Sequence, residues 1–257
     1  MIKYIQVKTI LNTVKGSDDW FGLKYNLNLY RGCTHRCIYC DSRSECYQIE
    51  NFDHDIIVKE NALELLQKEL PKKRVRGTVG FGSMNDPYQH IEKKLNMTVR
   101  ALEIMREWDM PVHLITKSNL VLRDIRILKE IGKIYSAVSF TITTGITLMP
   151  VLPFITDTED NIISIVEKAK EYGAKYIIPA FGMTLRDRQR AYYYDRLDEK
   201  FPGLSDKYRA KYKNYYSAGA PGYKKLSKVF YEKCAELGIL TKIPKYNAGI
   251  GIQGTLF

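Results

Sequence analysis

The stretch Tyr30-Arg31-Gly32-Cys33-Thr34-His35-Arg36-Cys37-Ile38-Tyr39-Cys40 decides how this chain is interpreted. Its cysteines, Cys33, Cys37 and Cys40, are separated by three and then by two residues. Within one loop this spacing lets three thiolates converge on a single point, as a cubane iron-sulfur cluster requires, and leaves one iron without a protein ligand. We therefore predict an iron-sulfur cluster with one iron open to chemistry.

Two other uses of these cysteines compete with the cluster. A structural zinc site takes four ligands, and zinc sites with three protein ligands usually include histidine; His35 lies in the loop, where a turn is expected to point it away. Disulfides are less favoured, because five cysteines cannot all pair and four of them fall between Cys33 and Cys46. Cys46 is either a reserve ligand or, as we prefer, a separate small thiol near the cluster.

The cysteine loop, with the aromatic Tyr39 just before the last cysteine, resembles the signature loop of the radical S-adenosylmethionine (radical SAM) enzymes. The resemblance implies a 4Fe-4S cluster whose open iron is chelated by the amino and carboxylate groups of SAM. An electron donor such as flavodoxin or ferredoxin then drives reductive cleavage of SAM to methionine and a 5'-deoxyadenosyl radical.

Composition sets broad limits on the class of protein. The chain has 257 residues, of which 45% are hydrophobic, so it can bury a sizeable core. No apolar run approaches the roughly 18 residues of a membrane span, and the first residues lack a secretory signal. We expect no membrane partner and a cytoplasmic location, which keeps thiolates reduced. The net charge of +11 indicates either anionic partners such as nucleic acid or a solvated basic surface.

Strand and helix patterns alternate along most of the chain, which predicts an α/β fold with a parallel sheet. Six strands are expected at residues 25–30, 75–81, 111–118, 136–143, 145–154 and 174–180, with a further strand at 3–10. Helices are expected at residues 59–70, 92–108, 121–133, 158–172 and 223–237, the last with Cys234 in the core. This order is similar to the partial (β/α)6 TIM-type barrel of radical SAM enzymes. We expect an N-terminal extension (1–24), the barrel (25–184) and a helical extension (185–257).

One junction breaks the pattern. Thr144 is followed directly by Gly145 and the next expected strand, although parallel neighbours need a crossover of about a dozen residues. We therefore predict a spatial break between these two residues, where a helical crossover is missing.

Several segments carry a resemblance to one branch of the superfamily, the spore photoproduct lyase-like (DNA repair photolyase-like) proteins. They are the cysteine loop, Asn85–Gln89, Thr116–Ser118, Val138–Thr141 and Pro150–Asp157. The resemblance implies that Tyr39 borders the adenine of SAM, that the 83–86 turn faces its amino group, that Lys117 meets its carboxylate, and that residue 139 or 141 lies near its ribose. The residues implied to bind the cofactor are therefore Tyr39, Ser83, Asn85, Asp86, Lys117, Ser139 and Thr141.

One departure from this branch concerns the hydrogen donor. The lyases that reverse the spore thymine lesion carry a donor cysteine just before the aspartate of this turn, where this chain has Ser83 and Met84. A serine O–H bond is too strong to give its hydrogen to a carbon radical. The resemblance thus leaves the catalytic residues unknown, unless Cys46 replaces the missing donor.

Two C-terminal segments bear on partners. Residues 185–225 interleave arginine and lysine with eight tyrosines; they form either a nucleic-acid site or, slightly favoured, amphipathic helices that pack tyrosines onto the barrel. The last five residues, Gln253-Gly-Thr-Leu-Phe257, resemble the peptide with which repair proteins bind the sliding clamp. A radical SAM enzyme that acts on DNA is the leading hypothesis. The alternatives are a radical SAM enzyme for a peptide or small metabolite, and a non-catalytic zinc or iron-sulfur module that binds nucleic acid.

Overall fold

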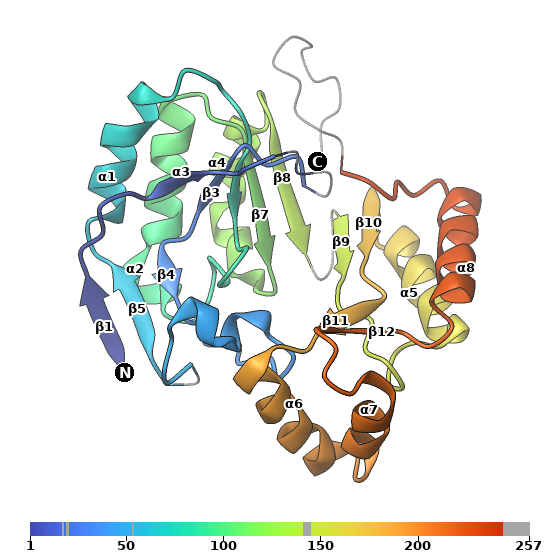
Figure 1. Cartoon of the computed structure of the whole chain (residues 1–257). Helices are drawn as coiled ribbons and strands as arrows, with labels where there is room; N and C mark the ends of the chain where they lie inside the picture. Colours follow the sequence, from blue (N-terminus) through green and yellow to red (C-terminus); the bar gives the residue numbers. More distant parts are fainter. Residues whose placement is uncertain (17, 19–20, 53, 141–144, 244–257) are drawn as a thin grey trace. The chain divides into compact units, whose positions relative to one another are not determined.

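The structure is a computed structural model that describes all residues except 17, 19–20, 53, 141–144 and 244–257 (Figure 1). The chain forms two compact units. The first contains Met1–His35, Asp53–Ile146 and Lys242–Phe257, and the second contains Arg36–Phe52 and Thr147–Thr241. The division falls inside the cysteine loop, directly after His35. The predicted boundaries at residues 24 and 184 are not tested by this grouping and stay predictions.

The main sheet of the first unit confirms the predicted parallel α/β fold. Adjacent parallel strands follow the chain order: β3 (Tyr25–Leu27), β6 (Val79–Phe81), β7 (Val112–Thr116), β8 (Ser136–Phe140) and the start of β9 (Gly145–Leu148). Strand β2 (Leu11–Thr13) is added antiparallel to β3. Val79, Val112 and Leu114 point to the same face of this sheet and are fully buried in the hydrophobic core. Strand β7 is shorter than predicted at both ends, β6 at its amino end, and β3 and β9 at their carboxyl ends.

A second sheet of the first unit was predicted only in part. It consists of β1 (Ile2–Ile5), β5 (Ile56–Lys59) and β4 (Tyr30–Arg31), in that order. The strand predicted at residues 3–10 ends at Ile5, and its side chains are mostly exposed rather than half-buried, with Tyr4 55% exposed. It is an edge strand paired with β5 alone.

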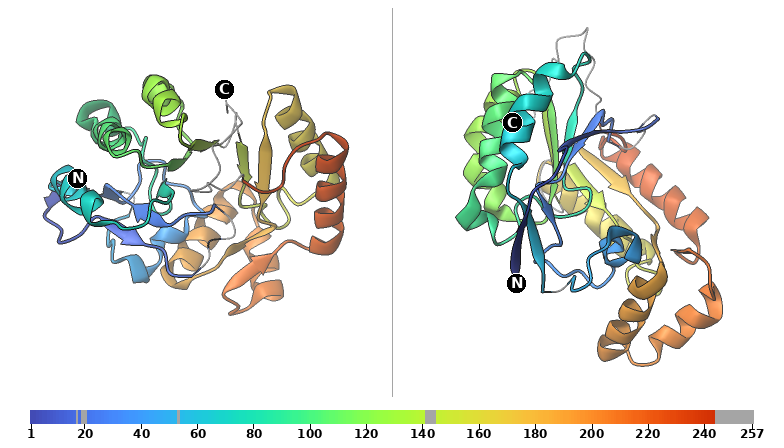
Figure 2. Two further views of the ribbon diagram at one scale, coloured as in Figure 1. Left: turned by 90° about the horizontal axis from the view of Figure 1, so that it is seen from above. Right: turned by 60° about the vertical axis from the view of Figure 1, so that its left-hand side comes forward.

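The helices of the first unit lie on one face of the main sheet (Figure 2). They are α1 (Ala62–Glu69), α2 (Glu92–Leu95), α3 (Met97–Glu107) and α4 (Ile125–Ile131). The single helix predicted at 92–108 is wrong: Asn96 adopts a left-handed backbone, with φ of 51°, and separates α2 from α3. The buried Glu92 carboxylate explains this break, because it accepts the N–H groups of Met97 and Thr98 at the start of α3.

In the second unit, β10 (Tyr176–Pro179) lies beside the end of β9, and α5 (Glu159–Glu171) packs along α8 (Tyr223–Glu236) (Figure 1). Thr158 begins α5 as predicted, since its hydroxyl accepts the N–H of Asn161. An ion pair joins Lys233 of α8 to Glu167 of α5 at 2.9 Å. Cys234 is fully buried, which confirms its predicted place in the core.

The tyrosine-rich segment forms α6 (Asp187–Lys200), α7 (Leu204–Tyr212) and the hairpin of β11 (Gly182–Thr184) with β12 (Ser217–Gly219). Its buried tyrosines, each at most 6% exposed, are Tyr193, Tyr194, Tyr208 and Tyr212. The Tyr193 hydroxyl donates to Tyr208 Oη at 3.0 Å, and Tyr208 Oη donates to the Pro153 carbonyl at 2.7 Å. The helix-packing interpretation is therefore confirmed for these four rings, which cannot stack on bases.

Two predictions fall on residues outside the described part of the chain. The expected break involves Thr144, and the structure describes only its flanks, in which Ser139 pairs with Gly145 and residue 140 pairs with Ile146 in parallel. The clamp-like tail at residues 253–257 is also outside the described residues. Among the helices that the structure describes, none is long and apolar enough to cross a membrane.

Candidate functional site

The entry to the cysteine loop is held in the first unit by a close backbone contact. Gly32 has a φ of +79°, and a Cβ at this position would lie 2.4 Å from the Asp55 carbonyl oxygen. A glycine is therefore required at this position. The next residue, Cys33, is 9% exposed, and Tyr30 before it donates its hydroxyl proton to Glu92 at 2.6 Å.

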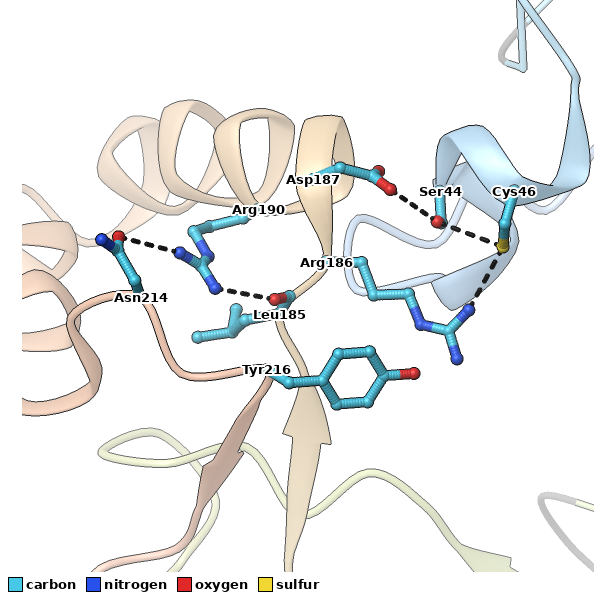
Figure 3. A pocket seen from close by; sticks show the side chains of 8 residues that line it. All are labelled: Ser44, Cys46, Leu185, Arg186, Asp187, Arg190, Asn214 and Tyr216. Carbon is cyan, nitrogen blue, oxygen red and sulfur yellow. Dashed lines mark hydrogen bonds between the residues drawn. The ribbon is translucent and has the colours of Figure 1, made fainter.

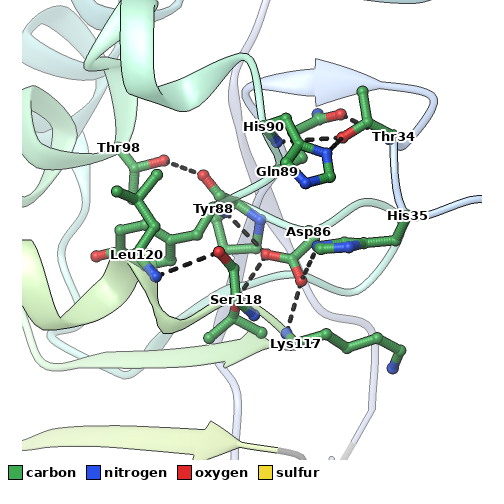
Figure 4. Close-up of polar contacts among 12 residues, drawn as sticks. Thr34, His35, Asp86, Tyr88, Gln89, His90, Thr98, Lys117, Ser118 and Leu120 are labelled. Carbon is green, nitrogen blue, oxygen red and sulfur yellow. Dashed lines mark hydrogen bonds and ion pairs between the residues drawn. The ribbon is translucent and has the colours of Figure 1, made fainter.

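The turn after β6 binds this entry through side chains (Figure 4). Asn85 Nδ2 donates to the Tyr30 carbonyl at 2.7 Å. Gln89 Oε1 accepts the N–H of Thr34 at 3.0 Å, and the N–H of His90 donates to Thr34 Oγ1 at 3.1 Å. Asn85, which the resemblance placed at the SAM amino group, is thus buried and in contact with the protein backbone.

Asp86 lies at the centre of this turn and is 8% exposed (Figure 4). Its carboxylate is within hydrogen-bond or ion-pair distance of four donors: the Tyr88 N–H (2.8 Å), Thr116 Oγ1 (2.6 Å), the Lys117 N–H (2.7 Å) and His35 Nε2 (3.0 Å). Burial acts to raise the pKa of Asp86, but the hydrogen bonds outweigh it and hold this pKa below its ordinary value. The carboxylate is therefore an anion that joins the cysteine loop to the end of β7.

Two further residues of the predicted SAM site are exposed. The Lys117 side chain extends away from Asp86, although its N–H binds that carboxylate (Figure 4). Ser83 Oγ accepts from Asn26 Nδ2 at 2.8 Å and lies 3.3 Å from Asn28 Nδ2. Both Lys117 and Ser83 therefore stand at the carboxyl ends of parallel strands, where ligands of α/β sheets usually bind.

Ser139, the residue implied to lie near the ribose, is fully buried on β8. Its Oγ lies 2.6 Å from Nε2 of His113 on the neighbouring strand β7. Burial lowers the pKa of His113 to about 4, so its imidazole is neutral at pH 7. Thr141, the alternative to Ser139, lies outside the described residues.

His113 makes the stability of the first unit depend on pH. Its pKa is about 4 in the folded chain against an ordinary value of 6.5, so the unfolded chain binds more protons between these values. Stability should therefore fall as the pH drops from 7 to 5, by about 2 kcal/mol from this group. Urea unfolding of the apoprotein at both pH values measures the fall, and His113→Gln should reduce it by that amount. An unchanged pH dependence in His113→Gln would contradict the assignment.

The second half of the cysteine loop belongs to the second unit. Cys37 and Cys40 are half-buried, and the Cys40 N–H donates to the Cys37 carbonyl at 3.1 Å. The same carbonyl accepts from Arg43 Nε at 3.2 Å. Arg43 is only 3% exposed, and its guanidinium lies 3.8 Å from the ring centre of Tyr192 and 4.6 Å from that of Phe52. This buried cation stacks on both rings and orients the turn.

Helix α6 supports the same turn. Arg188 Nε donates to the Arg43 carbonyl at 2.7 Å, and its Nη2 donates to the Ile49 carbonyl. Ile38 and Tyr39 pack against the cluster of buried tyrosines from α6 and α7. Burial, and then the neighbouring cysteines, raise the pKa of Tyr39. Arg188, one of the basic residues of the 185–225 segment, therefore anchors the loop.

Cys46 borders a separate cavity of about 410 Å³ in the second unit (Figure 3). Its Sγ lies 3.3 Å from Ser44 Oγ and 3.3 Å from Arg186 Nη1. Arg186 also forms an ion pair with Asp41 at 2.8 Å. The cavity is lined by Ser44, Cys46, Leu185, Arg186, Asp187, Arg190, Asn214 and Tyr216.

The donor set of the loop fits an iron-sulfur cluster in its chemistry. None of the five cysteines forms a disulfide, so the three loop thiols are not consumed in one. Cys33 belongs to the first unit and the other two loop cysteines to the second. Among the described residues, no three His, Cys, Asp or Glu side chains are already arranged around a metal position.

The chain belongs to the radical SAM superfamily, whose family model matches residues 27–192. Enzymes of this superfamily use a 4Fe-4S cluster and SAM, and they require an electron donor. The chain is therefore an enzyme of the radical SAM type. The matched range begins just before the cysteine loop and includes all the parallel strands from β6 to β10.

Curated relatives and solved structures agree with this membership. The uncharacterized protein Rv2578c of Mycobacterium tuberculosis is 25% identical over 247 residues, which covers 80% of this chain and 72% of that protein. The uncharacterized protein MJ0683 of Methanocaldococcus jannaschii is 30% identical over 143 residues, or 55% of this chain and 53% of that protein. Two structures of spore photoproduct lyase variants have TM-scores of 0.63 and 0.65 at 12% identity, covering 93% of this chain and 81% and 80% of theirs. They share its fold.

Proposed function

We propose that Cys33, Cys37 and Cys40 are the ligands of the 4Fe-4S cluster. When bound together with SAM, this group supplies a 5'-deoxyadenosyl radical. The observation that carries the proposal is the family match across a loop of three cysteines that form no disulfide. Anaerobic reconstitution followed by SAM and dithionite tests it: the enzyme should release 5'-deoxyadenosine, and a colourless protein that binds one zinc would disprove it.

The surroundings of the loop suggest how the chain receives SAM. We assign the exposed Lys117 ammonium to the carboxylate of SAM, because it extends from the carboxyl end of β7. Tyr39, beside Cys40, is assigned to the adenine, and Ser83 to the amino group. The hydroxyl of Ser139 is in contact with His113, so we assign Ser139 no direct hydrogen bond to the ribose. Its part in the site is to shape the edge of the sheet against which the ribose would lie.

For the substrate we propose nucleic acid, with DNA favoured. The chain carries a net charge of +11, and it shares its fold with spore photoproduct lyase. Four exposed cations of the 207–213 segment precede two exposed tyrosines: Lys207, Arg209, Lys211, Lys213, Tyr215 and Tyr216. Exposed cations can bind phosphates while exposed rings stack on bases. Arg188 and Arg190 are excluded from this surface because they bind backbone carbonyls.

A salt-dependent binding assay with single-stranded and damaged DNA tests this surface. Lys211→Glu/Lys213→Glu should weaken binding and lower the slope of log K against log salt by about 1 to 2, since each lost phosphate contact contributes about one unit. Tyr215→Ala/Tyr216→Ala should weaken binding by about 1 to 3 kcal/mol per lost stacking contact, with the salt slope unchanged.

The matched control for this assay is Lys168→Glu/Lys170→Glu. It makes the same change of charge on exposed residues of α5 in the same unit. Equal weakening by this control would show that only net charge matters, and the proposed surface would then be wrong.

The other hypotheses about the substrate, the kind of protein and its partners are supported to different degrees. A peptide or small metabolite as substrate is kept as the second candidate. A non-catalytic zinc or iron-sulfur module disagrees with membership of an enzyme superfamily. Cys46 as hydrogen donor, the sliding clamp as partner of residues 253–257, flavodoxin or ferredoxin as electron donor, and the cytoplasmic location stay predictions.

A further inference from the structure

The four contacts of Asp86 fill its carboxylate. Oδ1 faces the Tyr88 N–H and Thr116 Oγ1, and Oδ2 faces the Lys117 N–H and His35 Nε2. An ionised carboxylate offers about four lone-pair positions: three hydrogen bonds occupy three of them, and His35 Nε2 faces the fourth at 3.0 Å. The carboxylate therefore has no free acceptor position for the amino group of a ligand, which is the role that the family resemblance implied.

We infer that Asp86 is a positioning residue. Together with His35, it fixes the start of the cysteine loop relative to Lys117 at the end of β7. The role of Lys117 toward SAM rests on the proposed function. The contacts of Asp86 with His35 and Lys117 are observed independently of it. Oδ2 is the shared atom: it connects a histidine beside Cys33 with the backbone of the lysine at the end of β7 (Figure 4). The cysteine loop and Lys117 must keep a fixed relative position if one small ligand is to contact both.

Neighbouring contacts hold the loop entry without reaching Lys117. Asn85 binds the Tyr30 carbonyl, and Gln89 binds the Thr34 N–H. Loss of the Asp86 contacts should therefore let Lys117 move relative to the loop, while the loop entry stays attached to the turn. This separates a positioning effect from general unfolding.

The chemistry requires a carboxylate at this position. An asparagine would present an NH₂ group toward one of the donors, leaving the Lys117 N–H or the Thr116 hydroxyl without an acceptor. A buried donor without a partner is costly, and hydrogen bonds to a charged acceptor are about twice as strong as neutral ones. Asp86→Asn thus keeps the shape of the side chain and removes the function that we assign to it.

The first test uses amide hydrogen exchange of the apoprotein, which needs neither cluster nor SAM. In Asp86→Asn, the peptide containing Lys117 should exchange about tenfold faster, as expected for the loss of one charge-assisted hydrogen bond, while Thr34, whose N–H binds Gln89, and α3 exchange as before. His35→Gln removes the other contact of Oδ2, should also speed exchange at Lys117, and covers the case in which Asp86→Asn does not fold. The control is Asp124→Asn, a buried carboxylate of the same unit that pairs with Arg123.

The second test uses the reconstituted enzyme. SAM is titrated against the reduced cluster and followed by electron paramagnetic resonance. Asp86→Asn should retain its iron and bind SAM about tenfold more weakly, with KM raised more than kcat is lowered. The double variant Asp86→Asn/His35→Gln should bind SAM no more weakly than the weaker-binding single variant, because both changes break the same contact between Asp86 and His35. Unchanged exchange at the Lys117 peptide, or additive effects of the two changes, would overturn the inference. A wild-type enzyme that does not cleave SAM would overturn the proposed function and leave the exchange test intact.

Discussion

Cys40→Ala is expected to lose the iron-sulfur cluster and to lower the formation of 5'-deoxyadenosine from SAM at least about 100-fold, because three thiolates are the whole protein ligand set of an open cubane. The substitution leaves only Cys33 and Cys37. Iron content and the visible absorption of the reconstituted protein measure the first effect, and chromatography of the SAM cleavage products measures the second. Retention of iron and activity would show that Cys40 is no ligand.

Cys46→Ala is the matched control for this experiment. Cys46 follows Cys40 by six residues in the same unit, but its sulfur contacts Ser44 and Arg186. Cys46→Ala should keep the iron content of the wild type. If both variants lost iron equally, Cys46 would be a ligand, as the reserve-ligand alternative supposes. A Cys46→Ala enzyme that cleaves SAM but leaves its substrate radical unquenched would instead assign the hydrogen donor.

Gly82→Ala is expected to destabilise the first unit by about 3 kcal/mol or more, since it combines a strained backbone with a steric clash. Gly82 directly follows the strand β6 and has a φ of +96°, and a Cβ there would lie 2.2 Å from the Ile115 carbonyl oxygen and 3.1 Å from its carbonyl carbon. Backbone atoms of β7 cannot move aside as a flexible side chain would. Urea unfolding of the apoprotein measures the loss.

Gly203→Ala separates the clash from the strain. Gly203 also has a positive φ, of +77°, but no atom of the described residues lies within 4 Å of its hypothetical Cβ. This variant should therefore lose only about 1 kcal/mol, the cost of the left-handed backbone. If Gly82→Ala cost no more than Gly203→Ala, close approach of β6 and β7 would not be the reason for the glycine.

The order of strands and helices and the kind of cofactor loop could be predicted from the sequence because both depend on local patterns. Buried strands such as β7 are short apolar runs, and the amphipathic helix α5 begins at a capping threonine, Thr158. The cysteine spacing is likewise a feature of one loop. Each of these signals is contained within a few turns of chain, so no knowledge of distant neighbours is needed.

The break between α2 and α3 could not be predicted in this way. The segment 92–108 has helical periodicity throughout, yet the Glu92 side chain binds the N–H groups of Met97 and Thr98 and the hydroxyl of Tyr30. A buried carboxylate must find several donors, and the nearest ones available are at a new helix start. Tertiary burial thus overrides the local helix pattern.

The sequence by itself determined the parallel α/β fold, the three-cysteine loop and the superfamily to which the chain belongs. Only the tertiary structure decided what the polar residues near the loop do: Asp86 meets His35, and Arg188 meets the Arg43 carbonyl. These partners are separated by many residues along the chain, and the Arg188 contact spans 145 positions. The physical reason is that a hydrogen bond requires two groups within about 3 Å, and such proximity between distant segments arises only when the chain is folded.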